Sequence, residues 1–147
     1  MDYYREIEQK LATQIRYLQK ISELESEKKS AIERDDLDAA EALQIKTDAL
    51  IKEAQLMGRV IDGLCVQFQH QQGPISSDKI DQLKKIVKQL ADKAARQTQE
   101  NRHRLIEQMQ GVFQRLDHVR AGKNALAGYD KARHKTLPER GPNRGER

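Results

Sequence analysis

Hydrophobic residues recur at steps of three and four along most of this 147-residue chain, which places them on one side of an α-helix. In the first segment, from about residue 3 to residue 33, no Gly or Pro interrupts this spacing. Its apolar positions are Ile7, Leu11, Ile15, Leu18, Ile21, Leu24 and Ala31/Ile32. The pattern predicts one amphipathic helix about 45 Å long, because a helix rises about 1.5 Å per residue.

A second apolar stripe begins after the acidic sequence 34–38, which interrupts the first stripe. Asp35 or Asp36 is expected to cap the new helix, since a carboxylate can accept hydrogen bonds from unpaired amides of the first turn. The stripe consists of Leu43, Thr47, Leu50, Ala54, Met57, Ile61, Leu64 and Phe68. Gly58 and Gly63 each weaken the helix by about 1 kcal/mol relative to Ala. They can allow a close backbone approach or a bend, and the sequence leaves both open.

The sequence 71–74, Gln-Gln-Gly-Pro, is the clearest break in the chain, with a Gly suited to ending a helix and a Pro directly after it. Ser76 is the expected cap of a third helix. Ile75 and Ile80 flank that cap and can form a hydrophobic staple. The short connections on both sides of the second segment predict that neighbouring helices run in opposite directions.

The third stripe continues without Pro to about residue 120, and residues 121–129 loosen the pattern into a short terminal turn or a semi-ordered segment. The stripe is Ile80, Leu83, Val87, Leu90, Ala94, Gln97, Asn101, Leu105, Gln108, Val112, Leu116 and Val119. Because its middle is polar, we expect the two ends of this helix to pack better than its centre. The predicted fold is all-α, an elongated antiparallel three-helix bundle or coiled coil.

The net charge of +4 comes entirely from residues 131–147, where six basic residues oppose two acidic ones. This segment also holds two of the three prolines, which predicts a disordered basic tail after a helical domain spanning residues 1–130. Residues 1–130 carry 21 basic and 21 acidic side chains. A nucleic-acid-binding domain would carry its basic surface within the folded part, so we expect no nucleic-acid partner beyond a weak contact of the tail with phosphate.

The sequence contains no signature of catalysis, and we expect neither an enzyme nor a cofactor. The four His residues lack a second His or a Cys three or four positions away, the spacing of a helical metal site. Cys65 adjoins a stripe position and is expected to be a small buried apolar residue. No apolar run approaches the roughly 20 residues that cross a bilayer, and no apolar signal segment is present. These features predict a soluble cytoplasmic protein.

Helical bundles rich in Lys, Glu and Gln commonly recognise a partner's amphipathic helix. A coiled coil needs apolar residues at only two positions of each heptad. Five residues form a wider apolar surface than that: Leu105, Met109, Val112, Phe113 and Leu116. Leu105, Val112 and Leu116 are expected to pack on the first two segments. Met109 and Phe113 fit either packing or partner binding, because both side chains adapt to varied surfaces. Whether the free protein is a monomer or a homodimer stays open.

The order of several motifs resembles the FlgN-like flagellar export chaperones. The chain reads Ser-Glu-Lys-Lys-Ser-Ala-Ile over residues 26–32, then the acidic connection, then Lys-Thr-Asp-Ala-Leu-Ile over residues 46–51. The family's third helix carries an Asn followed by spaced aliphatic residues and a tail Tyr. The matching positions here are Asn101, Leu105-Ile106, Val112, Leu116 and Tyr129. The similarity extends over roughly residues 5–130, and the long basic end after Tyr129 departs from it.

The resemblance implies a cytoplasmic chaperone that holds the terminal helices of hook-associated axial proteins and delivers them to the flagellar export gate. In the family, the last helix and tail bind the client, and a tail Tyr contacts the gate. The candidate partner-binding residues are Asn101, Leu105, Met109, Val112, Phe113, Leu116 and Tyr129. Tyr129 either contacts the gate or pins the chain end on the bundle. The alternative is a structural coiled-coil adaptor or another component of a secretion apparatus.

Overall fold

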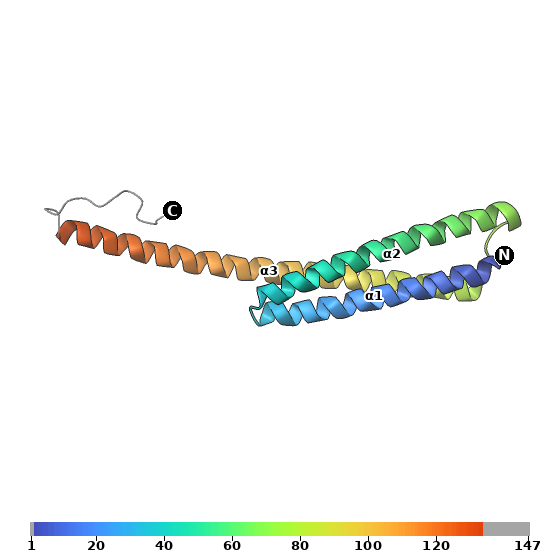
Figure 1. The fold of residues 1–147 in the computed structure, drawn as a ribbon, viewed down its shortest axis with the longest axis horizontal. Helices are drawn as coiled ribbons and strands as arrows, with labels where there is room; N and C mark the ends of the chain where they lie inside the picture. The colour runs from blue at the N-terminus through green and yellow to red at the C-terminus, as the bar shows by residue number, and fades with distance from the viewer. Residues whose placement is uncertain (1, 134–147) are drawn as a thin grey trace. The chain divides into compact units, whose positions relative to one another are not determined.

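The computed structural model describes residues 2–133, and the side chains of residues 124, 125 and 127–133 are outside that description. Over the described range the chain forms three helices and no strand, which confirms the predicted all-α fold (Figure 1). The helices are α1 (Tyr3–Glu33), α2 (Leu37–Gln72) and α3 (Asp78–Arg133). Of the expected basic tail, residues 131–133 are the end of α3, and residues 134–147 lie outside the described residues.

The turn between α1 and α2 depends on two consecutive Asp residues. Asp36 is the cap of α2, since its carboxylate accepts a hydrogen bond of 3.1 Å from the Ala39 amide. Asp35 adopts a left-handed conformation with a φ of 59°, which Asp tolerates better than most residues with a Cβ. The Asp36 amide then donates back to the Ala31 carbonyl oxygen at 2.9 Å. This compact turn reverses the chain and brings α2 back along α1.

The connection between α2 and α3 differs from the prediction at its cap. Ser77, and not Ser76, caps α3, because the Ser77 hydroxyl oxygen accepts a hydrogen bond of 3.2 Å from the Ile80 amide. The backbone of Ser76 is engaged elsewhere. Its amide donates to the Tyr4 hydroxyl oxygen at 3.2 Å, and that hydroxyl donates to the Ser76 carbonyl oxygen at 3.3 Å. Tyr4 therefore ties the start of α1 to this loop.

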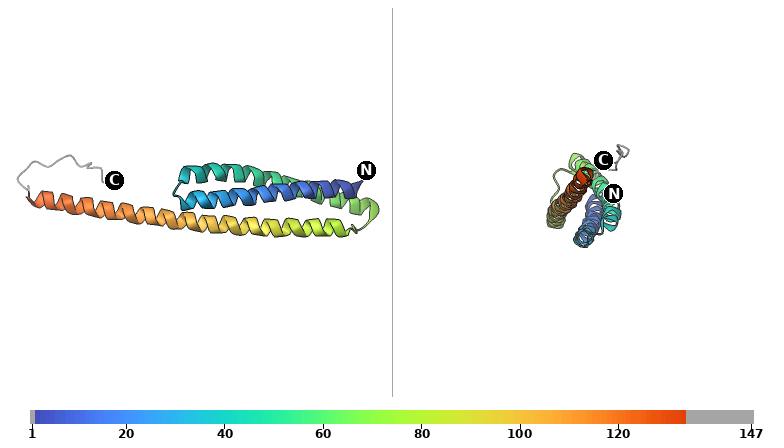
Figure 2. Two further views of the ribbon diagram at one scale, coloured as in Figure 1. Left: turned by 90° about the horizontal axis from the view of Figure 1, so that it is seen from below. Right: turned by 90° about the vertical axis from the view of Figure 1, so that its left-hand side faces the viewer.

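The chain consists of two compact units, Met1–Arg104 and Leu105–Arg147. In the first unit, α1, α2 and the N-terminal half of α3 lie side by side as an antiparallel bundle (Figures 1 and 2). Its core has two apolar clusters, and each draws on all three helices. One contains Ile7, Leu11, Ile61 and Ile80, and the other contains Leu18, Ile21, Ala54 and Ala94.

Aromatic side chains close one end of this bundle. The Tyr3 ring lies edge-on to the Phe68 ring at a centroid distance of 5.8 Å, and the Tyr4 ring is tilted against it at 4.9 Å. The Tyr3 hydroxyl also donates a hydrogen bond of 3.0 Å to the Gln71 side-chain oxygen. These contacts join the beginning of α1 to the end of α2, so the two tyrosines combine apolar packing with a satisfied hydroxyl.

The two glycines of α2 have different surroundings. A Cβ added at Gly58 would lie 3.1 Å from the side-chain nitrogen of Gln14, whereas a Cβ at Gly63 would meet nothing within 4 Å. The Gln14 nitrogen donates a hydrogen bond of 3.3 Å to the Ala54 carbonyl oxygen. Gly58 therefore provides space for a side chain that crosses from α1 to α2, and Gly63 has no such role.

The second unit contains the C-terminal part of α3. The helix continues through residues 121–129, where a terminal turn or a semi-ordered segment was expected, and ends at Arg133. Gly122 and Gly128 each reduce helix stability by only about 1 kcal/mol, and the nearest downstream Pro is Pro138. The expected terminal turn or semi-ordered segment is therefore wrong, because a cost of this size does not interrupt a helix that continues on both sides of each glycine.

Candidate partner-binding site

The second unit presents a helical face rich in exposed apolar side chains, which we call the 105–126 face. Its members are exposed to between 38% and 66%, apart from the half-buried Leu105. The face consists of Leu105, Ile106, Met109, Val112, Phe113, Leu116, Val119 and Leu126. Single exposed apolar residues are ordinary, but a continuous row of them marks an interaction surface.

The exposure along this face differs from the expected packing of α3. Val112 and Leu116 are exposed to 38% and 44%, although both were expected to be buried. The N-terminal end of α3 packs as expected, since Ile80 is fully buried. The expectation that both ends pack better than the centre is therefore wrong for the C-terminal end. Met109 and Phe113, which fitted either role, are exposed to 45% and 57%.

The spacing of the core residues on α3 gives the physical reason. Ile80, Val87, Ala94 and Asn101 follow one another at seven-residue steps and are buried or half-buried. The next positions in that series are Gln108, Arg115 and Gly122, none of which is a large apolar residue. The apolar residues Met109 and Leu116 each stand one position later, and adjacent helix positions point about 100° apart. The 105–126 face thus does not continue the core series of the bundle.

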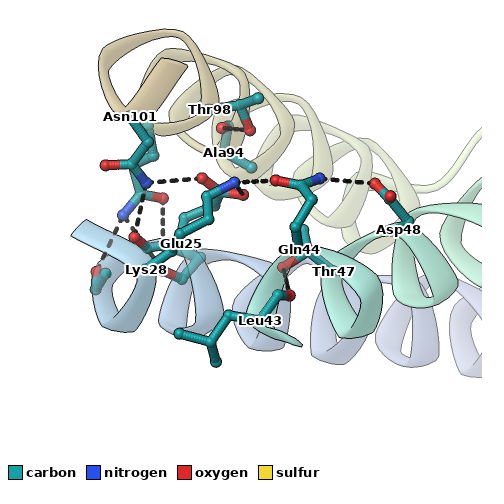
Figure 3. A network of polar contacts seen from close by, with 12 residues as sticks. Glu25, Lys28, Leu43, Gln44, Thr47, Asp48, Ala94, Thr98 and Asn101 are labelled. Carbon is teal, nitrogen blue, oxygen red and sulfur yellow. Dashed lines mark hydrogen bonds and ion pairs between the residues drawn. The ribbon is translucent and has the colours of Figure 1, made fainter. Parts of the chain in front are cut away.

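Asn101, one of the candidate partner-binding residues, lies inside the bundle. It is only 2% exposed, and its side-chain nitrogen donates to both the backbone oxygen and the carboxylate of Glu25 on α1, each at 2.8 Å (Figure 3). Glu25 is fully buried, and its second carboxylate oxygen lies 3.0 Å from the Lys28 ammonium. Asn101 therefore satisfies a buried charge between two helices.

The same network extends to α2 through Lys28. The Lys28 ammonium donates to the side-chain oxygen of Gln44, and the Gln44 nitrogen donates to the Asp48 carboxylate at 2.8 Å (Figure 3). Lys28 is 6% exposed. Burying this charge is tolerable only because Glu25 and Gln44 partner it. We call Glu25, Lys28, Gln44 and Asn101 the polar layer of the bundle.

One turn before Asn101, Gln97 makes a second polar connection between α3 and α1. The Ser22 hydroxyl donates to the Gln97 side-chain oxygen at 2.7 Å. The Gln97 nitrogen donates to the Ser22 carbonyl oxygen at 3.3 Å and to the Ser26 hydroxyl at 3.2 Å. The polar middle of the third stripe thus pairs with polar groups of α1, and the centre of α3 packs through hydrogen bonds.

A hollow of about 120 Å³ beside Asn101 is lined by side chains of α1 and α3. Small-molecule sites are typically about 300–1,000 Å³, so this hollow is smaller than such a site. Its lining residues are Glu25, Ser26, Lys29, Gln97, Glu100, Asn101 and Arg104. Polar contacts already occupy several of them, including the Arg104 guanidinium, which donates to the Asn101 oxygen at 3.1 Å.

Metal-binding groups, membrane-spanning helices and the single cysteine are the remaining features to consider in the part of the chain that the structure describes. No group of three or more His, Cys, Asp and Glu side chains within it could hold a metal ion. None of its helices combines the length and the apolar character that crossing a membrane needs. Cys65 is half-buried and packs against the cluster of Ile7, Leu11, Ile61 and Ile80, in accord with its expected apolar role.

Tyr129 is the remaining candidate residue. It belongs to the C-terminal part of α3, but its side chain lies outside the described residues. Its two alternative roles therefore stay predictions.

No protein-family model matches the chain, and no curated protein or solved structure is significantly similar to it. The structure gives a local reason for two residues of the FlgN-like resemblance. Lys28 lies in the Glu-Lys-Lys stretch, and Asn101 is the Asn of the third helix. Both belong to the polar layer, so a packing role accounts for their presence.

Proposed function

We propose that this protein is a helical binding protein that holds an amphipathic helix of another polypeptide on the 105–126 face. The observation that carries the proposal is the exposure of Met109, Val112, Phe113 and Leu116 on successive turns of one helix. An amphipathic helix packs on such a row through side chains at its own three- and four-residue steps.

Within this class, we propose a cytoplasmic flagellar type III export chaperone. Its clients would be hook-associated axial proteins, whose terminal amphipathic helices expose apolar stripes before assembly. Support comes from the motif order that resembles the FlgN-like family and from the exposed 105–126 face. Covering a client stripe prevents its aggregation until export.

A structural coiled-coil adaptor, or another component of a secretion apparatus, is the second candidate. The 56-residue length of α3 favours this alternative, since long helices commonly join parts of an assembly. The two candidates differ in their expected behaviour. A chaperone protects an otherwise aggregating client and releases it, whereas an adaptor stays in its assembly.

Co-purification with hook-associated proteins, combined with light scattering of those clients, tests the chaperone proposal. We expect the wild-type protein to suppress client aggregation and the double variant Met109→Ser/Phe113→Ser to lose that suppression. The matched control is Ile45→Ser/Leu56→Ser, which removes two apolar residues of α2 that are exposed to 66% and 51%. Equal activity of both double variants, or no binding to any axial protein, contradicts the proposal.

The proposed gate contact of Tyr129 needs a separate measurement. We expect Tyr129→Ala to retain client binding and to weaken binding to the isolated export-gate domain. Loss of thermal stability with unchanged gate binding would instead indicate that Tyr129 pins the chain end on the bundle.

A further inference from the structure

The charges around the 105–126 face are arranged asymmetrically. Counting Met109 and Leu116 as position a of a heptad places Leu105, Val112, Val119 and Leu126 at position d. Arg115 then takes position g, Arg120 position e and Lys123 position a, the positions at which a packed helix meets its partner. All three basic residues are exposed.

The acidic residues of the same stretch lie elsewhere on the helix. Glu107 occupies position f and Asp117 position b, which face away from a partner helix. The 105–126 face is therefore apolar, with Arg115 and Arg120 at its border and Lys123 within it, and its acids are on the outer side. A partner that complements it must supply negative charge.

The same face of a second copy does not supply that charge. In parallel pairing, Arg115 would face Arg120 of the other copy, and the two Lys123 side chains would meet at the same core level. In antiparallel pairing, Glu107 and Asp117 remain at outer positions, so no acid of this face reaches the three bases. Like charges at these positions oppose association, because nothing compensates their repulsion.

We propose that the helix bound on the 105–126 face carries Asp or Glu residues beside its apolar stripe, placed to meet Arg115, Arg120 and Lys123. This inference rests on the proposed function, since it names the chemistry of the helix that the face holds. The apolar contacts provide most of the affinity, and the bases select and orient the acidic helix.

Three synthetic amphipathic peptides test the inference on the full-length protein. They share one Leu-based apolar stripe, and the residues beside that stripe are Glu, Gln or Lys. We expect the Glu peptide to bind at least about tenfold more tightly than the Lys peptide at low salt, with the Gln peptide between them. The preference should shrink as ionic strength rises towards about 0.5 M, because salt screens exposed charges.

A charge-reversed variant tests whether the preference for the Glu peptide arises from this face. Arg115→Glu/Arg120→Glu/Lys123→Glu should reverse the order, so that the Lys peptide binds best. The matched control Lys84→Glu/Lys85→Glu/Lys88→Glu changes the net charge equally at exposed positions of α3 within the first unit and should keep the wild-type order. Circular dichroism verifies that both variants keep their helical content.

The possible results separate the two proposals. Equal binding of all three peptides, abolished by Phe113→Ser, overturns the charge inference and leaves the binding function intact. Binding of no peptide and of no hook-associated protein overturns both. A dimer of the free chain that Phe113→Ser dissociates identifies a second copy as the occupant, which also overturns the charge inference.

Discussion

The side-chain amide of Asn101 on α3 donates two hydrogen bonds to Glu25 on α1, one to the backbone oxygen and one to the carboxylate, each 2.8 Å long. Glu25 is fully buried, so its charge depends on Asn101 and Lys28 for partners. A buried polar contact of this kind is satisfied in one alignment of the two helices and broken in others. We infer that this pair fixes the register of α3 against α1.

Replacing Asn101 tests that role. Asn101→Ala should lower the free energy of unfolding by about 1–3 kcal/mol, because the Glu25 carboxylate loses a buried donor. Asn101→Asp should lower it further, since it sets a second carboxylate against the first. Urea unfolding measures both changes. Gln99→Glu, at an exposed position of the same helix, is the control and should change stability by less than about 0.5 kcal/mol. If Asn101→Asp changed the free energy of unfolding no more than this control does, the polar layer would not contribute to the stability of the bundle.

The Tyr4 hydroxyl gives a second prediction. Tyr4→Phe keeps the ring against Phe68 but removes both hydrogen bonds to the Ser76 backbone. We expect a loss of about 0.5–1.5 kcal/mol in unfolding free energy and faster hydrogen exchange at the Ser76 amide. Tyr3→Phe, which removes only the bond to Gln71, should leave Ser76 exchange unchanged. Unaltered exchange in Tyr4→Phe would show that the loop does not depend on this hydroxyl.

The glycines of α2 give a third prediction. Gly63→Ala should raise the unfolding free energy by about 0.5–1 kcal/mol, because Ala favours the helix and its methyl group meets open space. Gly58→Ala should gain less, since its methyl group crowds the Gln14 side chain. The difference should disappear in a Gln14→Ala background, which removes the crowded atom. A double-mutant cycle measures the coupling between positions 58 and 14, and a coupling free energy of zero would contradict their close approach.

Two isoleucines near the start of α3 give a fourth prediction. Ile80 is fully buried in the core, whereas Ile86 is 41% exposed on the same helix. Ile80→Ala should destabilise the bundle by about 2–5 kcal/mol, the usual range for a truncation that leaves a core cavity. Ile86→Ala should cost about 1 kcal/mol or less, because water already reaches its side chain. Thermal unfolding compares the two, and similar melting temperatures would place Ile80 outside the core.

The sequence predicts the helices well because helix formation is governed by local patterns. The three- and four-residue spacing gives all three helices, and the first is expected and observed over residues 3–33. Asp36, which caps α2, is one of the two residues expected to cap that helix. The cap at Ser77 was missed by one position, because the Tyr4 contact that occupies Ser76 joins residues 72 positions apart. Local sequence contains no signal for such a contact.

The candidate site is only partly predictable for the same reason. The width of the apolar face in the sequence indicates Met109, Phe113 and their neighbours, whereas their exposure to solvent is seen only in the structure. Ile106 and Val119 are further exposed members of that face, and their spacing from Phe113 and Leu116 is the signal that could have found them. Asn101 is a candidate partner-binding residue only through the family resemblance, whereas its position opposite Glu25 makes it part of the core.

The number, the approximate limits and the apolar sides of the helices follow from the amino-acid sequence, because they depend on interactions between residues a few positions apart. The folded chain sets the burial of Glu25, Lys28 and Asn101. It also sets the exposure of Val112 and Leu116. Burial depends on which side chains other helices bring to a position. A charged residue can be buried where another helix supplies its partners, and an apolar residue remains exposed where no neighbouring segment covers it.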